Sequence, residues 1–215
     1  MFEEMMYSSN NDNVSTYKQE DGGWRNMGNV KETVIQFGEG CFLRGFVDYF
    51  FQKMRDQGLF EGSVVVVQPI ERGMCEMLEK QNCEYNLFLR GIDNGEVVDE
   101  HTHIDVISRC VNPYTDSEAY MALAENPDLR FIVSNTTEAG IEFVADNKFE
   151  DAPARSFPGK LTQLLYKRYK LGLKGFIILS CELIDHNGEE LEKCCLRYAD
   201  LWELGEEFKT WLKDE

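Results

Sequence analysis

The chain has 215 residues, of which 43% are hydrophobic and 28% charged, and its formal net charge is −17. A chain of this length can form one large domain with a sizeable core. The acidic balance argues against a general nucleic-acid-binding protein, because Lys and Arg neutralise phosphate backbones. No apolar run approaches the roughly 20 residues of a membrane helix, and the acidic residues 1–6 are unlike a signal peptide. We therefore expect a cytoplasmic protein without nucleic-acid or membrane partners.

Metal and nucleophile motifs are absent from the sequence. The seven cysteines form no CxxC pair, so we expect buried, reduced thiols. His101 and His103 alternate along one predicted strand without an evident third ligand, which favours exposed histidines and no metal. The chain contains no GxSxG, GxxxxGK[ST] or HExxH motif. No catalytic residue is predicted in this chain.

The first half of the chain predicts a βαβ unit behind a polar tail. Residues 1–30 are rich in Asn, Ser, Asp and Gly, which is typical of a flexible or loosely docked tail. A β-branched and aromatic strand over 33–37 is closed by Gly38, and the four valines of 64–67 predict a strand buried on both faces. Between these strands, apolar residues at helical spacing form one face of a helix that ends at Gly58, namely Leu43, Phe46, Val47, Phe50, Phe51 and Met54.

The rest of the chain predicts a hairpin followed by further βα units. Strand patterns over 85–90 and 97–103 flank Asn94-Gly95, a hairpin signal, and residues 104–111 either extend the second strand or form another. A helix is expected over 117–124. Strands over 129–133 and 175–181, both buried, alternate with helices over 157–169 and 189–213. We therefore predict an α/β fold over residues 31–188, with a doubly wound Rossmann-type sheet, mostly parallel, and a β-hairpin insertion.

The first strand-to-helix turn predicts a dinucleotide site. Gly38 permits a tight turn, Gly40 lets the backbone approach a pyrophosphate, and the following helix offers unpaired N–H groups and its positive dipole end. Leu43 replaces the third glycine of GxGxxG, so a plain strand-to-helix turn remains the alternative. The residues of this turn that we expect to contact a cofactor are Phe37, Gly38, Gly40, Cys41, Phe42, Leu43 and Arg44.

Gln68 ends the second strand, where a carboxylate usually binds the ribose 2′-hydroxyl. A glutamine can bond to that hydroxyl without repelling a 2′-phosphate, and Arg72 is close in the sequence. We therefore expect Gln68 to contact the cofactor. The residues leave the choice between NAD and NADP open.

Two later strand ends carry polar residues. Ser134, Asn135 and Thr136 follow a buried strand and are predicted to contact the nicotinamide-side ribose and phosphate, with a helix-capping loop as the alternative. Glu182 ends the next strand and is predicted to face the same crevice as a substrate or cofactor ligand. A surface salt bridge is the alternative for Glu182.

Residues 34–46 read Val-Ile-Gln-Phe-Gly-Glu-Gly-Cys-Phe-Leu-Arg-Gly-Phe and resemble the opening fingerprint of the long-chain mannitol dehydrogenase family. Segments 134–140, 156–162 and 181–188 extend the resemblance in order, and it is greatest to the branch that reduces tagaturonate. It implies an oxidoreductase that uses NADH to reduce D-tagaturonate, a hexuronate, to D-altronate in hexuronate catabolism. Fructuronate reductases, mannitol or mannitol-phosphate dehydrogenases, and a non-catalytic nucleotide-binding module are alternatives.

The resemblance also implies what this chain lacks. In the family the proton donor is a lysine, assisted by Asn and His, on a second, mostly helical domain. We expect residues 189–215 to lead toward that domain, so that this chain is a fragment, inactive alone, of a monomer or weak oligomer. The face that meets the helical domain would then be apolar and prone to self-association. Cys41 replaces the usual Asn of the fingerprint, and Leu183 replaces an oxyanion-stabilising Asn of mannitol dehydrogenases, which favours the uronate-reductase branch.

Overall fold

The centre of the molecule is a five-stranded parallel sheet. The computed structural model describes residues 16–18, 24–26, 31–137 and 139–215. The sheet order is β7-β4-β3-β8-β9, which is the 3-2-1-4-5 order of a doubly wound fold and confirms the predicted fold class. Its strands are β3 (Glu32–Phe37), β4 (Ser63–Val67), β7 (Ile107–Val111), β8 (Phe131–Ser134) and β9 (Ile177–Ser180).

The predicted N-terminal tail lies mostly outside the described residues. Within it, β1 (Thr16–Lys18) and β2 (Trp24–Asn26) pair as antiparallel strands. After this segment the chain enters β3, and the predicted bounds of the domain stay a prediction. The interpretation of residues 1–30 as a flexible tail stays a prediction.

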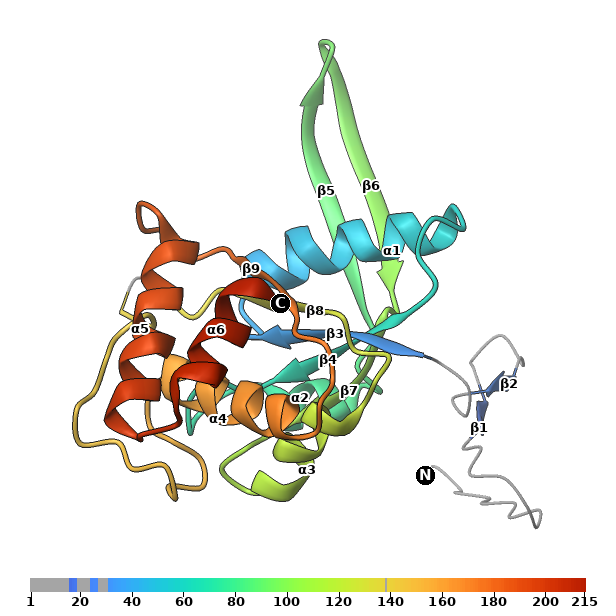
Figure 1. Cartoon of the computed structure of the whole chain (residues 1–215). Helices are drawn as coiled ribbons and strands as arrows, with labels where there is room; N and C mark the ends of the chain where they lie inside the picture. The colour runs from blue at the N-terminus through green and yellow to red at the C-terminus, as the bar shows by residue number, and fades with distance from the viewer. Residues whose placement is uncertain (1–15, 19–23, 27–30, 138) are drawn as a thin grey trace.

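Helices cover both faces of the sheet. Figure 1 shows α1 on the opposite side of the sheet from α4 and α5. One hydrophobic cluster joins the sheet to α3, α4, α5 and α6, and the other joins it to the first helix, α2 and the base of the hairpin. The helical segments are η2 (Leu43–Val47), α1 (Asp48–Asp56), α2 (Cys75–Lys80), α3 (Ser117–Ala122), η3 (Leu123–Glu125), α4 (Phe157–Lys170), α5 (Asn187–Leu201) and α6 (Glu206–Asp214).

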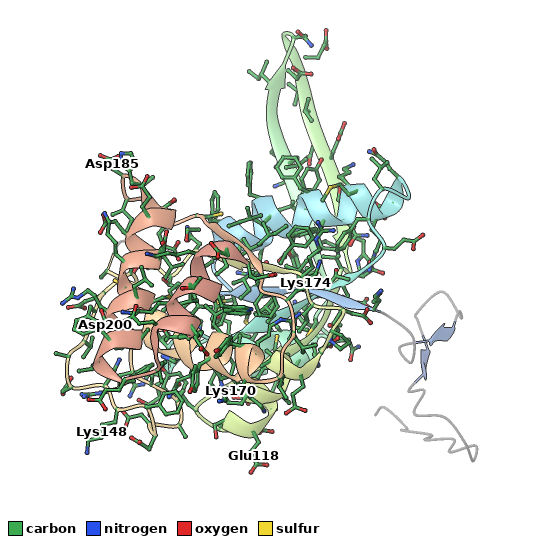
Figure 2. The ribbon with its side chains drawn as sticks, in the orientation of Figure 1. Glu118, Lys148, Lys170, Lys174, Asp185 and Asp200 are labelled. Atoms are coloured by element: carbon green, nitrogen blue, oxygen red, sulfur yellow. The ribbon has the colours of Figure 1, made fainter. Side chains whose placement is uncertain are left out.

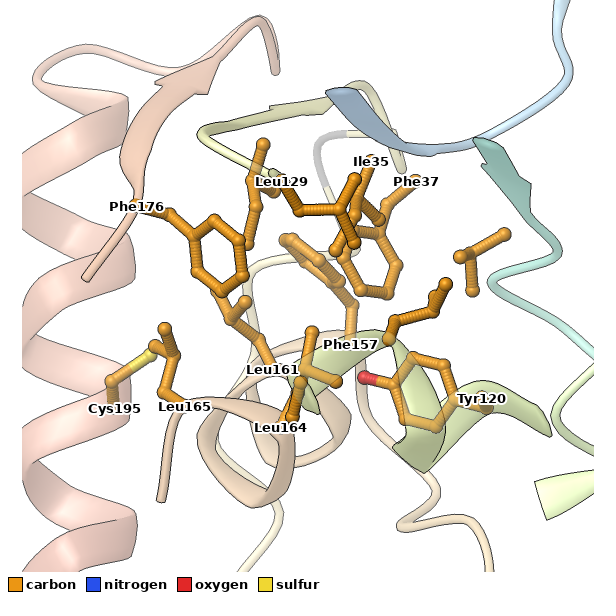
Figure 3. Close-up of a cluster of buried hydrophobic side chains, with 14 of the residues drawn as sticks. Ile35, Phe37, Tyr120, Leu129, Phe157, Leu161, Leu164, Leu165, Phe176 and Cys195 are labelled. Carbon is orange, nitrogen blue, oxygen red and sulfur yellow. The ribbon is translucent and has the colours of Figure 1, made fainter. Parts of the chain in front are cut away.

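Helix α4 forms over the range predicted for it, and local signals mark both of its ends. The Ser156 side chain accepts a hydrogen bond from the Gly159 N–H at 3.1 Å, Pro158 occupies the first turn, and Gly172 follows the helix with φ +67°. The apolar face of α4 is buried against the sheet (Figure 3), with Leu161, Leu164 and Leu165 at its centre. The Phe37 ring contacts Tyr120 edge to face and Phe157 at a tilt. Burial of these aliphatic and aromatic groups anchors the β3 strand end that carries the glycine turn.

The predicted hairpin is confirmed. Strands β5 (Tyr85–Asp93) and β6 (Glu96–Ile104) pair in continuous register, and Asn94 and Gly95 both have positive φ, as a two-residue turn of type I′ requires. The hairpin projects from the body of the domain (Figure 1). Strand β7 is separate from β6 and pairs with β4, which settles the two alternatives for residues 104–111.

The first helix exists, but the prediction of its buried face is wrong in part. Phe46 and Phe50 are 52% and 48% exposed, whereas Asp48 and Gln52 are buried with Leu43. The reason is the π-helical segment η2, whose wider turn places one extra residue between Leu43 and the next inward position. Strict 3.6-residue spacing therefore assigned two phenylalanines, Phe46 and Phe50, to the wrong face.

Two predictions near the C-terminus are also wrong. The strand over 175–181 is not buried on both faces, because β9 is an edge strand and leaves Ile177 and Leu179 exposed by 44% and 47%. The single helix over 189–213 is two helices, α5 and α6, separated by Glu203 and Gly205 with positive φ. The break lets α6 fold back so that Phe208 packs against Tyr169. Helix α2 was not predicted.

Charged side chains surround this core, and Figure 2 shows Glu118, Lys148, Asp185 and Asp200 at the periphery of the body. All seven cysteines are free, and five are buried as predicted, whereas Cys41 is exposed and Cys181 is partly exposed. His101 and His103 are exposed, as predicted. In the part of the chain that the structure describes, no helix is long and apolar enough to cross a membrane. The same residues contain no group of three or more His, Cys, Asp or Glu side chains that could hold a metal ion.

Candidate nucleotide-binding site

The predicted cofactor segments meet where the strand order reverses. Strand β3 lies between β4 and β8, so its carboxyl end is next to the carboxyl ends of both. The Gly38 N–H donates to the Val67 carbonyl at 3.1 Å, and the Asn135 N–H donates to the Phe37 carbonyl at 3.2 Å. Doubly wound folds bind ligands in the crevice at such a switch point. The structure therefore brings the turn after β3 and the loop after β8 together.

Gly38 needs to be a glycine for two reasons. Its φ is +124°, a conformation that residues with a Cβ rarely adopt. A Cβ on Gly38 would also lie 2.9 Å from Leu43 Cδ1 and 3.0 Å from the Asn135 carbonyl oxygen. Leu43 is buried against this turn, which explains the departure from GxGxxG: a packed leucine occupies the place of the third glycine.

Gly40 presents an open backbone. It is exposed, and a Cβ placed on it would have no neighbour within 4 Å. The Arg44 N–H donates to the Gly40 carbonyl at 3.1 Å and begins the helical hydrogen bonds, so the N–H groups just before Arg44 have no acceptor one turn earlier in the helix. Cys41 and Phe42 are exposed beside them. This geometry suits an anionic group such as a pyrophosphate.

Glu39 and Arg44 stabilise the turn through hydrogen bonds. Arg44 Nε donates to the Glu39 carbonyl at 2.8 Å, and the buried Glu39 carboxylate accepts a bond from the Met74 N–H at 2.8 Å. Burial raises the pKa of Glu39 above its usual range. The glycine at position 73 leaves room for that carboxylate, since a side chain there would collide with it. Sequence reasoning missed Glu39, and its partner 35 residues away left no local signal.

Gln68 has a different environment from the one predicted. It is buried, and its Nε2 donates to the carbonyls of Ile70 and Glu71 at 2.9 and 3.1 Å. Its Oε1 accepts a bond from the Cys75 N–H at 3.4 Å. The amide thus holds its own loop together, and the contact of Gln68 with a cofactor stays a prediction. Arg72 is exposed on the same loop.

Glu182 is neither on the surface nor open to the crevice. It is 2% exposed, and its carboxylate accepts bonds from Ser134 Oγ at 3.1 Å and from the N–H and Oγ1 of Thr136 at 3.0 and 3.1 Å. Asn135 Nδ2 donates to the Cys181 carbonyl at 2.5 Å. The end of β9 therefore holds the 134–136 loop in place, and the alternative of a surface salt bridge for Glu182 is wrong.

Leu183, immediately after this buried carboxylate, is 83% exposed and apolar. Its side chain has no donor and so cannot stabilise an oxyanion. No nucleophile-and-base pair was predicted in this chain. The arrangement around Gly38, Gly40 and the 134–136 loop can therefore bind a dinucleotide, and a proton donor for a reduced carbonyl is not among the predicted residues.

A family model, the mannitol dehydrogenase Rossmann domain, matches residues 32–215. The chain belongs to the mannitol dehydrogenase family. The match covers the whole five-stranded sheet and both loops of the candidate site. The resemblance of residues 34–46 to the fingerprint of this family is thereby confirmed.

Curated relatives of this mannitol dehydrogenase family domain include altronate oxidoreductases. The chain is 54% identical to that of Phocaeicola vulgatus over 187 residues and 55% identical to that of Bacteroides thetaiotaomicron over 187 residues. It is 46% identical to the altronate oxidoreductase of Bacillus subtilis over the same length. Each alignment covers 85% of this chain and 39% of the relative. The chain therefore spans well under half the length of these relatives.

Solved structures share the fold. The mannitol 2-dehydrogenase of Pseudomonas fluorescens, in a ternary complex with NAD and D-mannitol, superposes with a TM-score of 0.75 at 21% identity. The match covers 87% of this chain and 40% of that one. A D-sorbitol dehydrogenase superposes with a TM-score of 0.74 at 20% identity. At this level of identity the likeness establishes the Rossmann-type architecture of the mannitol dehydrogenase family.

Proposed function

We propose that this domain binds NADH at the Gly38–Gly40 turn, as the cofactor-binding part of an oxidoreductase that reduces D-tagaturonate to D-altronate in hexuronate catabolism. The observation that carries the proposal is the open backbone at Gly40, at the switch point of a sheet from the mannitol dehydrogenase family. Identities of 54% and 55% to altronate oxidoreductases support the choice of substrate.

In this proposal the residues of the turn hold the pyrophosphate. The backbone of Gly40 and the helix start at Cys41 and Phe42 provide N–H donors and the positive end of the helix dipole. Ser134 and Thr136 are held by Glu182, so the Asn135 backbone between them has a fixed position beside Gly38. When bound, the nicotinamide supplies a hydride. The residues of this chain bind and orient the cofactor.

The choice of NADH over NADPH is part of the proposal. It rests on the resemblance to NADH-dependent reductases, because the residues near the end of β4 do not discriminate between the two cofactors. Gln68 bonds to its own loop, and Arg72 is an exposed cation. The test is a competition between the two cofactors. We expect NADH to bind at least tenfold more tightly than NADPH, and an equal or reversed preference would refute this part.

The binding proposal is tested by titrating NADH into the protein and following nicotinamide fluorescence. Gly40→Ala places a methyl group where the pyrophosphate would approach, so we expect roughly a tenfold or greater rise in Kd, equivalent to about 1.4 kcal/mol. Its melting temperature should not change, because the new Cβ has no neighbour within 4 Å. Gly91→Ala is the matched control, since position 91 is also free of neighbours but lies on the projecting hairpin. A folded protein that does not bind NADH would refute the proposal.

The substrate is tested on the longer protein. We expect NADH-dependent reduction of D-tagaturonate by a protein of the relatives' length, and NADH binding with little turnover by this chain. Fructuronate reductase and mannitol or mannitol-phosphate dehydrogenase activities are the competing outcomes. A higher kcat/KM for fructuronate or fructose than for tagaturonate would overturn the substrate. Full turnover by the 215 residues alone would refute the proposal that the proton donor lies outside this chain.

A further inference from the structure

A buried carboxylate lies directly behind the glycine turn. Asp48 is the first residue of α1, is fully buried, and faces Gln36 of β3 and Tyr85 of β5. Its Oδ1 has no hydrogen-bond partner among the described residues. A buried carboxylate with an unpartnered oxygen is costly in its charged form, so this group requires an explanation.

Asp48 shares two donors with the turn. Gln36 Nε2 lies 3.1 Å from the Gly38 carbonyl oxygen and 3.4 Å from Asp48 Oδ2. Tyr85 Oη lies 2.7 Å from the Arg44 carbonyl oxygen and 3.1 Å from the same Oδ2. Gly38 and Arg44 bracket the proposed pyrophosphate-binding segment. Gln36 and Tyr85 therefore each lie within hydrogen-bond distance of one carbonyl of this segment and of Asp48 Oδ2.

The number of protons on Tyr85 and Gln36 determines which protonation state of Asp48 fits the geometry. A carbonyl oxygen can only accept, so the single hydroxyl proton of Tyr85 belongs to the 2.7 Å bond with the Arg44 carbonyl. The contact between Tyr85 Oη and Asp48 Oδ2 then needs a proton from the carboxyl group. Gln36 has two amide protons and can serve both of its acceptors. The geometry is satisfied when Asp48 is a neutral acid.

We propose that Asp48 is a positioning residue that acts as a neutral acid: it donates its proton to Tyr85 and so leaves Tyr85 and Gln36 to hold the Arg44 and Gly38 carbonyls. The proposal rests on nucleotide binding at this turn. When Asp48 ionises, its oxygens can only accept, so Oδ2 draws the single Tyr85 proton away from the Arg44 carbonyl, while Gln36 keeps one amide proton for each of its acceptors. The turn then loses the Tyr85 bond at its Arg44 end.

The electrostatic surroundings agree with this assignment. Burial raises the pKa of Asp48 from 3.8 to about 7 and outweighs the lowering effects of Gln36, Tyr85 and Arg44. Arg44 is the charged group whose attraction acts on Asp48, while Gln36 and Tyr85 face it as neutral groups. Tyr85 has a raised pKa and keeps its proton throughout the physiological range. The switch between the two arrangements therefore falls near neutral pH.

The experiment measures the Kd for NADH from pH 6 to pH 8 in three proteins. If only the neutral acid supports the turn, about one molecule in eleven is competent at pH 8, so the wild-type Kd rises roughly tenfold across this range. Asp48→Asn keeps a donor toward Tyr85 without a titrating proton and should bind with a nearly constant Kd. Asp56→Asn removes the same charge from the exposed end of the same helix and should keep the wild-type pH profile.

A second measurement needs neither the variants nor the cofactor. In the wild-type protein, the ¹³C shifts of the Asp48 carboxyl and of the Arg44 carbonyl should move with one common midpoint near pH 7. A carboxyl midpoint below pH 5, or an Arg44 carbonyl shift that does not follow the carboxyl, overturns the Asp48 proposal. A pH-independent wild-type Kd overturns it too and leaves NADH binding intact. Failure to bind NADH at any pH refutes the proposed function instead.

Discussion

Replacement of Glu182 tests how the loop after β8 is held. The carboxylate accepts three hydrogen bonds, one from Ser134 and two from Thr136, and it is buried. Glu182→Ala removes all three acceptors and leaves a small cavity. Glu182→Gln preserves the shape: its carbonyl can accept both bonds from Thr136, and its amide can donate to the Ser134 hydroxyl.

The magnitudes separate the roles considered for Glu182. Hydrogen bonds to a charged group contribute about 1.5–3 kcal/mol each, and water can reach the half-buried Thr136 after truncation, so we expect Glu182→Ala to lower the unfolding free energy by about 3–5 kcal/mol. Glu182→Gln should cost about 1 kcal/mol, because it exchanges charge-assisted bonds for neutral ones. A surface salt bridge would have contributed roughly 0–1 kcal/mol.

The assay is urea denaturation followed by tryptophan fluorescence, with NADH titration of each folded variant. We expect the NADH affinity to fall in the order wild type, Glu182→Gln, Glu182→Ala, since the 134–136 loop lies against Gly38. Glu192→Ala is the matched control, because Glu192 is exposed on α5 and should change stability by less than about 0.5 kcal/mol. A Glu182→Ala protein with wild-type stability and wild-type affinity would refute this account of the loop.

Four further outcomes are expected. Gly38→Ala should lose about 2–5 kcal/mol in urea denaturation, from the strain of a positive φ and overlap with Leu43; wild-type stability would contradict the close packing of Leu43 and Asn135 against this turn. Arg168→Lys should lose about 2–4 kcal/mol in the same assay, because the buried guanidinium donates to four backbone carbonyls and one ammonium cannot reach them all. The Asp48 carboxyl is protonated in both the folded and the unfolded protein below about pH 4 and ionised in both well above pH 7. The unfolding free energy of the wild type relative to Asp48→Asn should therefore fall by at most about 4 kcal/mol as pH rises between these values. A difference in melting temperature between the two proteins that does not change with pH would exclude the raised pKa. An aromatic disulfide reagent should modify Cys41 first, since it is the exposed thiol, and Cys41→Ser should abolish the fast phase.

Local signals in the sequence were enough for most elements of the fold. The four valines of β4 and the Asn94-Gly95 turn each depend on residues adjacent in the chain, and each forms as predicted. The βα alternation around the hairpin likewise predicted the doubly wound sheet. These features follow from backbone preferences and hydrophobic periodicity, which act over a few residues.

Features that depend on contacts between distant parts of the chain were not predicted from the sequence. The π-helical turn after Leu43 rotates the helix so that Asp48 is inward and Phe46 outward, a change that periodicity alone does not reveal. The edge position of β9 exposes Ile177, because sheet order is a property of the assembled strands. The break before α6 is stabilised by packing of Phe208 on α4.

The candidate site shows the same division. The sequence by itself determined that a glycine turn follows β3 and that polar residues follow β8, since both are readable beside their strands. Only the tertiary structure decided that Glu182 holds Thr136 from 46 positions away and that Asp48 shares Tyr85 with Arg44 across 37 positions. Such partners are chosen by burial: a polar group removed from water must find a donor or acceptor wherever the fold brings one near.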